Sequence, residues 1–76
     1  MRSIHTAELA AVLRVMVAAR KRVGLTQQQL ARRLRRPQSF VSKYETGERR
    51  LDIVEFLWIL RALEADPCVY RKSHPV

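Results

Sequence analysis

Residues 26–45, TQQQLARRLRRPQSFVSKYE, decide the fold because they encode two short helices that meet at a tight turn. Thr26 is followed three residues later by Gln29. This spacing is typical of a capping box, in which the hydroxyl and the amide each satisfy a backbone N–H group at the start of a helix. Apolar residues at positions 30, 31 and 34 share one face of the segment that follows. An amphipathic helix is therefore predicted over residues 27–34.

The turn after this helix contains Arg36 and Pro37. A residue before proline is disfavoured in the helical conformation, so the first helix should end before Arg36. The proline ring fixes φ near the helical value, and its missing N–H falls where a helix has no acceptor for it. Pro37 is therefore predicted to open a second helix over residues 38–45.

The second helix has two unlike faces when successive residues are turned by about 100°. One arc is apolar and contains Phe40, Val41 and Tyr44. The opposite arc is polar and contains Gln38, Ser39, Ser42, Lys43 and Thr46. Amide, hydroxyl and ammonium groups can hydrogen-bond to base edges in the major groove of DNA. An arc of this kind is more often an ordinary solvated helix face, so it does not decide the function alone.

The chain resembles the helix-turn-helix of the phage repressor and Cro-like family, also called the xenobiotic response element family. The matching positions keep a fixed register and are Arg20, Gly24 to Gln27, Leu30, Ala31, Leu34, Gln38 to Glu45, Gly47, Leu51, Asp52, Glu55 to Leu57, Ala62 and Leu63. The resemblance implies an all-α, compact five-helix lambda-repressor-like domain with its helix-turn-helix at helices 2 and 3. It also implies binding to double-stranded DNA, usually as a homodimer on near-palindromic operators.

Two positions depart from the family pattern, and both lie at the turn. The family normally has glycine where this chain has Arg35, and a Ser or Thr cap where this chain has Pro37. A left-handed conformation at Arg35 would cost roughly 1–2 kcal/mol. The departures therefore concern the geometry of the turn rather than the pairing of the two helices.

The basic residues are concentrated around this pair of helices. The chain has 15 Lys and Arg against 7 Asp and Glu, which gives a formal net charge of +8. No acid lies between Glu8 and Glu45, whereas that interval contains basic residues from Arg14 to Lys43. Such a patch attracts polyphosphate in a salt-dependent way. An anionic membrane would attract it as well, so the patch favours DNA only because it coincides with the helix pair.

The length of 76 residues leaves room for one domain and not for a catalytic cleft lined by a second layer of structure. No apolar run approaches the roughly 20 residues that span a bilayer, and the N-terminus lacks the apolar centre of a signal peptide. We therefore expect a cytoplasmic protein that does not associate with membranes. Cys68 is the sole cysteine, and His5 and His74 lie near opposite ends, so no metal site or cofactor is expected. No catalytic constellation at usable spacing indicates an enzyme or a small-molecule substrate.

A first helix is predicted over residues 7–23, with Thr6 as its cap. An apolar stripe runs along it and contains Leu9, Val12, Leu13, Met16 and Val23. Arg20 lies within this stripe, and an unpaired buried guanidinium is strongly destabilising. Glu45 borders the inner face of the second helix of the pair and is the candidate partner. We predict a structural ion pair between Arg20 and Glu45, which the resemblance also implies; the alternative is that both side chains reach solvent.

The predicted DNA contacts fall into two groups. Four residues of the polar arc are expected to reach base edges: Gln38, Ser39, Ser42 and Lys43. The N-terminus of the first helix of the pair can face a phosphate, and the resemblance places the loop after Gly47 beside the DNA backbone. The expected phosphate contacts are Thr26, Gln27, Arg36, Tyr44, Arg49 and Arg50.

A further helix is predicted over residues 53–64, because Asp52 and Glu55 repeat the capping-box spacing. Its predicted core stripe contains Ile53, Phe56, Leu57, Leu60 and Leu63, while Val54, Trp58 and Ile59 lie off this stripe. A helix that is apolar on more than one side needs a second covering surface. That surface is a last helix, a second copy of the chain, or a protein partner.

The last helix is predicted over residues 67–71, because Asp66 and Pro67 form an N-cap followed by proline. Val69 and Tyr70 are expected to pack against the preceding helix, with a frayed tail over residues 72–76.

These features favour a sequence-specific transcriptional regulator, and a repressor in particular. The alternative is an antitoxin-like or other protein-interaction module in which DNA binding is secondary. RNA recognition is disfavoured because the polar arc has no aromatic side chain for stacking unpaired bases.

Overall fold

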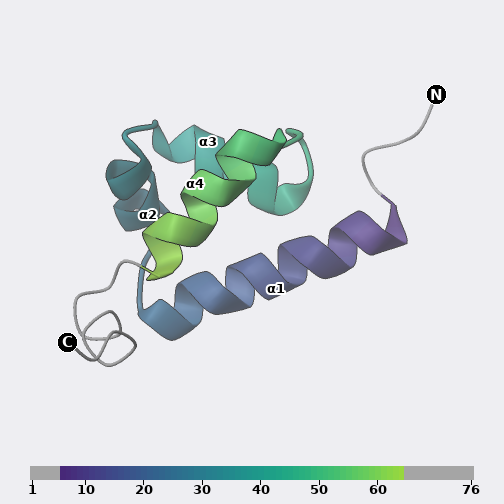
Figure 1. The fold of residues 1–76 in the computed structure, drawn as a ribbon, viewed down its shortest axis with the longest axis horizontal. Helices are drawn as coiled ribbons and strands as arrows, with labels where there is room; N and C mark the ends of the chain where they lie inside the picture. Colours follow the sequence, from purple (N-terminus) through teal and green to yellow (C-terminus); the bar gives the residue numbers. More distant parts are fainter. Residues whose placement is uncertain (1–5, 65–76) are drawn as a thin grey trace.

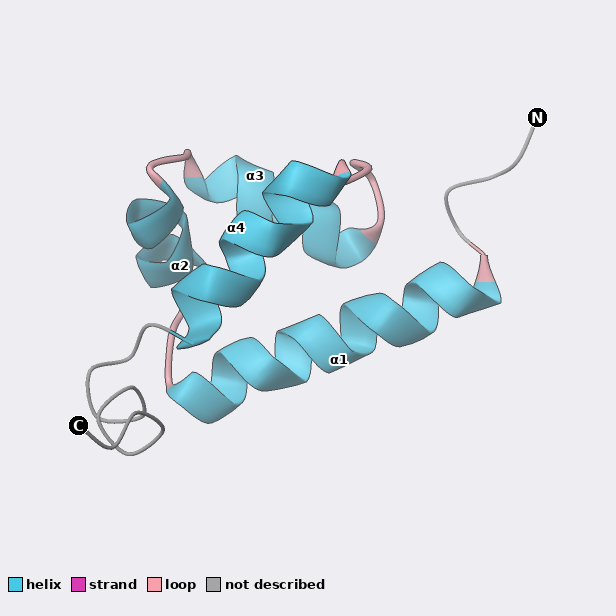
Figure 2. Cartoon of the chain, viewed as in Figure 1, coloured by secondary structure: helices cyan, strands magenta, loops and turns pink. Residues whose placement is uncertain are grey.

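The computed structural model describes residues 6–64, which form four helices (Figure 1). These helices are α1 (Ala7–Val23), α2 (Gln27–Leu34), α3 (Gln38–Thr46) and α4 (Ile53–Glu64). Their ranges are those predicted from the sequence, except that α3 ends one residue later. Short loops join them in Figure 2, and no strand occurs in this range. The fold is all-α, whereas the predicted fifth helix over residues 67–71, Cys68 and the tail over residues 72–76 lie outside the described residues.

Local capping explains where the first two helices begin. The Oγ1 atom of Thr6 accepts a hydrogen bond of 3.1 Å from the backbone N–H of Leu9. At the start of α2, Thr26 Oγ1 accepts from the Gln29 N–H at 3.0 Å, and Gln29 Oε1 accepts from the Thr26 N–H at 2.9 Å. Between these helices Gly24 adopts φ 88°, a left-handed conformation that glycine takes without steric cost. The chain therefore turns sharply from α1 into α2.

The turn between α2 and α3 contains a strained residue. Arg35 has φ 57° and ψ 44°, the left-handed conformation, at a cost of roughly 1–2 kcal/mol for a side chain other than glycine. Pro37 has φ −66° and ψ 155°, so it is the extended residue before α3 and not part of the helix. Its carbonyl accepts a 3.0 Å hydrogen bond from the Phe40 N–H, which is the role of an N-cap backbone.

The core lies where α2, α3 and α4 meet α1. In Figure 1, α1 runs along the molecule and the other three helices are grouped over its middle and C-terminal part. The buried apolar residues come from all four helices and are Leu13, Met16, Leu30, Ala31, Phe40, Val41, Tyr44, Ile59 and Leu63. Because the inner faces of α2 and α3 both enter this core, the orientation of α3 is fixed by packing.

The buried face of α4 differs from the sequence prediction. Ile53 and Leu57, predicted in the core, are 76% and 53% exposed, whereas Ile59, predicted at the surface, is 0% exposed. Val54 and Trp58 are exposed, as expected of a surface position. The physical reason is that α4 is apolar on almost every side, so its neighbours and not its periodicity select the buried face.

No helix between residues 6 and 64 is long and apolar enough to cross a membrane.

Candidate nucleic-acid interface

The polar arc of α3 is presented to solvent while its apolar arc is anchored. Gln38, Ser39 and Lys43 are exposed and Ser42 is half-buried. The opposite side of the helix packs into the core, so this arc is the surface that α3 can offer to a ligand. Its amide, hydroxyl and ammonium groups are suited to base edges, and none of its members is acidic.

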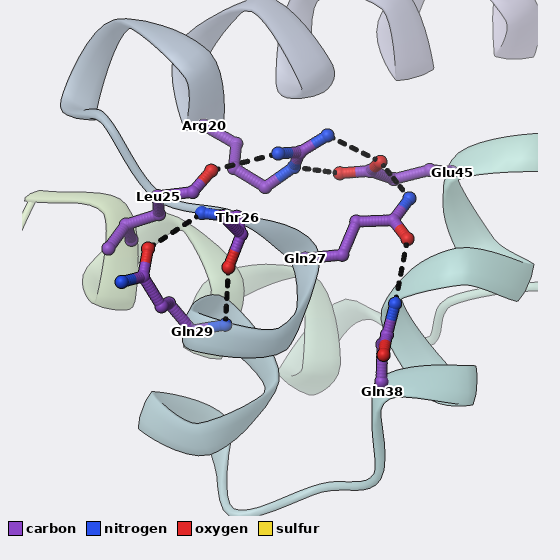
Figure 3. A network of polar contacts seen from close by, with 7 residues as sticks. All are labelled: Arg20, Leu25, Thr26, Gln27, Gln29, Gln38 and Glu45. Carbon is purple, nitrogen blue, oxygen red and sulfur yellow. Dashed lines mark hydrogen bonds and ion pairs between the residues drawn. The ribbon is translucent and has the colours of Figure 1, made fainter.

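A buried ion pair ties α3 to the end of α1 (Figure 3). Arg20 Nε donates to Glu45 Oε2 at 2.7 Å, and Arg20 Nη2 donates to Glu45 Oε1 at 3.1 Å. The two side chains are only 10% and 5% exposed. Arg20 Nη1 also donates to the backbone carbonyl of Leu25 at 2.8 Å. Hydrogen bonding to Glu45 raises the pKa of Arg20, so its guanidinium stays charged. The structure thus brings together the two residues that the sequence predicted to pair.

A chain of hydrogen bonds links the same carboxylate to a predicted DNA-reading residue. Gln27 Nε2 donates to Glu45 Oε1 at 2.8 Å, and Gln38 Nε2 donates to Gln27 Oε1 at 3.4 Å, as Figure 3 shows. A primary amide has two N–H donors and an acceptor oxygen, so Gln38 retains its Oε1 and one N–H for another partner. The buried pair thereby orients Gln27 and, through it, the first residue of α3.

The N-terminus of α2 lies beside this network. The capping box occupies the backbone N–H of Thr26, but the first N–H groups inside a helix, here those of Gln27 and Gln28, have no intrahelical acceptor. Such N–H groups and the positive end of the helix dipole favour an anion. Thr26 and Gln27 are therefore placed where a backbone phosphate could bind next to the arc of α3.

The position of Tyr44 contradicts its predicted contact with a DNA phosphate. Its side chain is 0% exposed and packs edge-to-face against Phe40, with ring centroids 5.5 Å apart. Its hydroxyl has no hydrogen-bond partner within the described part of the chain. Burial raises the pKa of Tyr44, so the hydroxyl stays protonated. The phosphate assignment is wrong because Tyr44 lies within the apolar arc rather than at its edge.

Arg49 and Arg36 converge on an acid that the sequence analysis assigned only to a cap. Arg49 Nη1 and Nη2 donate to Glu55 Oε1 and Oε2, both at 3.0 Å, and Arg36 Nη2 lies 3.6 Å from Glu55 Oε2. Both guanidinium carbons lie 4.8 Å from the centroid of the Phe40 ring. The guanidinium of Arg49 therefore has a structural partner, whereas Arg50 is exposed and enters no ion pair between residues 6 and 64.

Glu55 also performs the predicted capping role. Its Oε1 accepts from the Asp52 N–H at 3.1 Å, and its own N–H donates to Asp52 Oδ1 at 2.7 Å. The hydrogen bonds from Arg49 and from the Asp52 backbone lower the pKa of Glu55. The spacing from Arg49 to Glu55 was the available sequence signal for this cluster, but a loop separates the two residues and its path is not readable from the sequence.

The structure contains two short helices joined by a tight turn, and the second helix presents an acid-free polar arc. This arrangement defines a helix-turn-helix DNA-binding domain. The family model described as a helix-turn-helix domain matches residues 8–71. A solved structure of an XRE-family like protein from Pseudomonas syringae pv. tomato str. DC3000 is 48% identical, with a TM-score of 0.76 over 91% of this chain and 85% of that chain. The search of curated proteins found no significant match. The chain belongs to the XRE, or Cro-like, family of helix-turn-helix domains, a class of DNA-binding transcription regulators.

Proposed function

We propose that the protein is a sequence-specific repressor that binds near-palindromic operators as a homodimer. The observation that carries the proposal is the exposed arc of α3, anchored from behind by the core and by the Arg20–Glu45 pair. Repression needs no additional surface, because a protein bound to an operator excludes other proteins from the same DNA.

The chemistry of each side chain assigns it to base edges or to phosphates. Gln38, Ser39, Ser42 and Lys43 contact base edges, with Lys43 suited to the acceptors of guanine and Gln38 to adenine. Thr26 and Gln27 bind a phosphate at the N-terminus of α2, and Arg50 binds one from the loop after α3. Arg36 and Arg49 contribute positive charge from their positions beside Glu55.

The dimer is supported by the exposed apolar surface of α4. Ile53, Val54, Leu57 and Trp58 form an apolar stripe in which each residue is at least 47% exposed. Contiguous exposed apolar side chains are typical of interaction sites. A dimer that uses the α4 stripe would place two copies of α3 about 34 Å apart, so that both half-sites lie on one side of the duplex.

The decisive experiment is a selection of bound fragments from random duplex DNA at two salt concentrations. We expect two inverted half-sites with centres about 10 base pairs apart. Raising the salt concentration should weaken binding to unrelated duplexes more than binding to the selected operator. The reason is that phosphate contacts dominate nonspecific binding. Recovery of no enriched sequence would contradict sequence-specific binding. A single unpaired half-site, together with a monomer in sedimentation on DNA, would contradict the dimer.

A second candidate is supported by the same α4 stripe. In a protein-interaction module of the antitoxin type, a different protein covers Val54 and Trp58, and DNA binding is secondary. Co-purification of the product of a neighbouring gene, lost when Trp58 is replaced by Ser, would favour this alternative. Operator binding by the isolated protein at physiological salt favours the repressor.

A further inference from the structure

A basic hollow lies between the C-terminal end of α2, the turn that follows it and α4. It is lined mainly by Arg33, Arg35, Arg36, Arg61 and Trp58, and its volume is about 500 Å³. Arg36 lies over the ring of Phe40, which belongs to the buried face of α3. None of the residues proposed to read bases lines this hollow.

The four guanidinium groups have little acidic compensation. Arg36 lies 3.6 Å from Glu55, and Arg33 Nη1 donates to the carbonyl of Ala62 at 3.0 Å. Between residues 6 and 64, no ion pair involves Arg33, Arg35 or Arg61. The planar N–H fork of arginine matches the oxygen atoms of a phosphate. The hollow is thus chemically suited to an anion that accepts several hydrogen bonds.

Trp58 adds an aromatic surface at the edge of these charges. Its side chain is 47% exposed, and the guanidinium carbon of Arg36 lies 5.7 Å from its ring centroid. An exposed indole ring can stack against the flat ring of a ligand, as aromatic side chains stack on nucleic-acid bases. A ligand that carries both a flat ring and a phosphate can therefore use both parts of the hollow.

Arg35 supplies an independent argument. Glycine would adopt φ 57° without cost, whereas Arg35 holds this left-handed conformation against a steric penalty. Residues held in such strained conformations concentrate at functional sites. The strained residue here also lines the hollow, which gives its guanidinium a role that a glycine could not fill.

We propose that this hollow binds a nucleotide, defined here by its shared chemistry of an aromatic ring beside a phosphate. Arg33, Arg35 and Arg61 hold the phosphate, and Trp58 stacks on the ring. The volume lies within the range of small-molecule sites. The site shares no residue with the base-reading arc of α3, but its Trp58 also belongs to the α4 stripe proposed for the dimer.

The test uses the single tryptophan of the full chain, which gives one indole N–H signal in a nitrogen-15 NMR spectrum. The probes are adenosine monophosphate, adenosine and inorganic phosphate, each titrated at constant ionic strength. We expect adenosine monophosphate to shift the indole signal saturably and to bind at least tenfold more tightly than either fragment. Absence of a saturable shift, or equal affinity for inorganic phosphate alone, would overturn the proposal.

A second titration distinguishes a free nucleotide from the backbone of duplex DNA. A short duplex of unrelated sequence is added to the protein already saturated with adenosine monophosphate. Under the proposal, the indole shift persists, since no base-reading residue lines the hollow. Displacement of the nucleotide by the duplex would show that the hollow belongs to the DNA-binding surface and would overturn the proposal.

Two variants and a matched control test the assignment of residues. Arg35→Gln and Arg61→Gln should each weaken binding of adenosine monophosphate by about tenfold, because each removes a charge-assisted contact. Arg22→Gln removes the same charge from an exposed position on α1 and should leave the affinity unchanged. An equal loss in Arg22→Gln would assign the effect to net charge and contradict the site. Thermal melting of all three variants verifies that they fold.

Discussion

Gln27 donates a hydrogen bond of 2.8 Å from its Nε2 to Oε1 of Glu45, the carboxylate that also holds the buried guanidinium of Arg20. One acid thus joins α1, the start of α2 and the end of α3. The relationship makes Glu45 responsible both for the position of the recognition helix and for the orientation of a residue beside the DNA-reading arc.

Replacing Glu45 by Ala should therefore lower stability and DNA affinity together. The variant leaves Arg20 buried without its acid, and breaking a buried pair from one side costs about 3–5 kcal/mol. Urea unfolding and operator binding measure the two effects. Glu48→Ala, which removes an exposed acid nearby, should change the stability little. A Glu45→Ala protein that kept its full melting temperature would rule out the structural role.

Gln27→Ala separates the two roles of this network. The variant keeps the Arg20–Glu45 pair but removes the amide that links Glu45 to Gln38. We expect a small change in melting temperature and a clear loss of operator affinity. If operator affinity stays at the wild-type value, the orientation of Gln38 does not depend on Gln27.

Lys43→Ala and Arg50→Ala should weaken DNA binding in different ways. Lys43→Ala should reduce the free energy of operator binding by about 1–3 kcal/mol and relax the sequence preference at one base position. Arg50→Ala should weaken all sequences alike and reduce the salt slope by about 1. Binding to operator and random duplexes at several salt concentrations measures both. Equal losses on both duplexes for both variants would contradict the assignment.

Arg35→Gly should stabilise the fold. It removes a left-handed strain of roughly 1–2 kcal/mol. Glycine also gives the unfolded chain more conformational entropy, which offsets roughly 0.4–1 kcal/mol of this gain, so the free energy of unfolding should rise by about 0.5–1 kcal/mol. Arg32→Gly is the matched control, because residue 32 lies inside α2, where glycine should destabilise by about 1 kcal/mol. Urea unfolding should thus give opposite signs for the two variants, and equal signs would contradict the strain at Arg35.

Tyr44→Phe should raise stability without weakening operator binding. The change removes a buried hydroxyl that has no partner in the described structure, and such groups cost about 1–3 kcal/mol when left unsatisfied. The ring and its packing against Phe40 remain. Thermal melting and operator titration measure the outcome. A loss of operator affinity would instead support a contact between Tyr44 and a DNA phosphate, which the burial of Tyr44 argues against.

Glu55 should make the fold sensitive to acid. Its folded-state pKa lies below the ordinary value because Arg49 and the Asp52 N–H hydrogen-bond to the charged form. The resulting stability is full above the unfolded-state pKa of about 4.3, and it is lost as the pH falls through the lower folded-state pKa. Glu55→Gln retains the cap but not the charge. Its melting temperature should fall less than that of the wild type between about pH 5 and pH 2. Parallel pH profiles would contradict the assignment.

The local signals for the helices were readable because each depends on a few neighbouring residues. The Thr26–Gln29 capping box, Gly24 and the Asp52–Glu55 pair fix helix ends through short-range hydrogen bonds and backbone sterics. The pairing of Arg20 with Glu45 was also predictable, since a charge within an apolar stripe requires a partner and few acids were available. The arc of α3 could be assigned because its two faces differ strongly in polarity.

Tertiary packing decided what these local signals left undetermined. In α4, apolar residues surround nearly the whole helix, so its contacts with α1 and α2 selected Ile59 for the core and left Ile53 and Leu57 exposed. The path of the loop after α3 brought Arg49 to Glu55, and the depth of the core enclosed Tyr44. The sequence alone determined the four helices and the chemistry of the α3 arc, because caps and polarity act over a few residues. Only the tertiary structure determined which side chains reach solvent, because burial depends on elements distant in the chain.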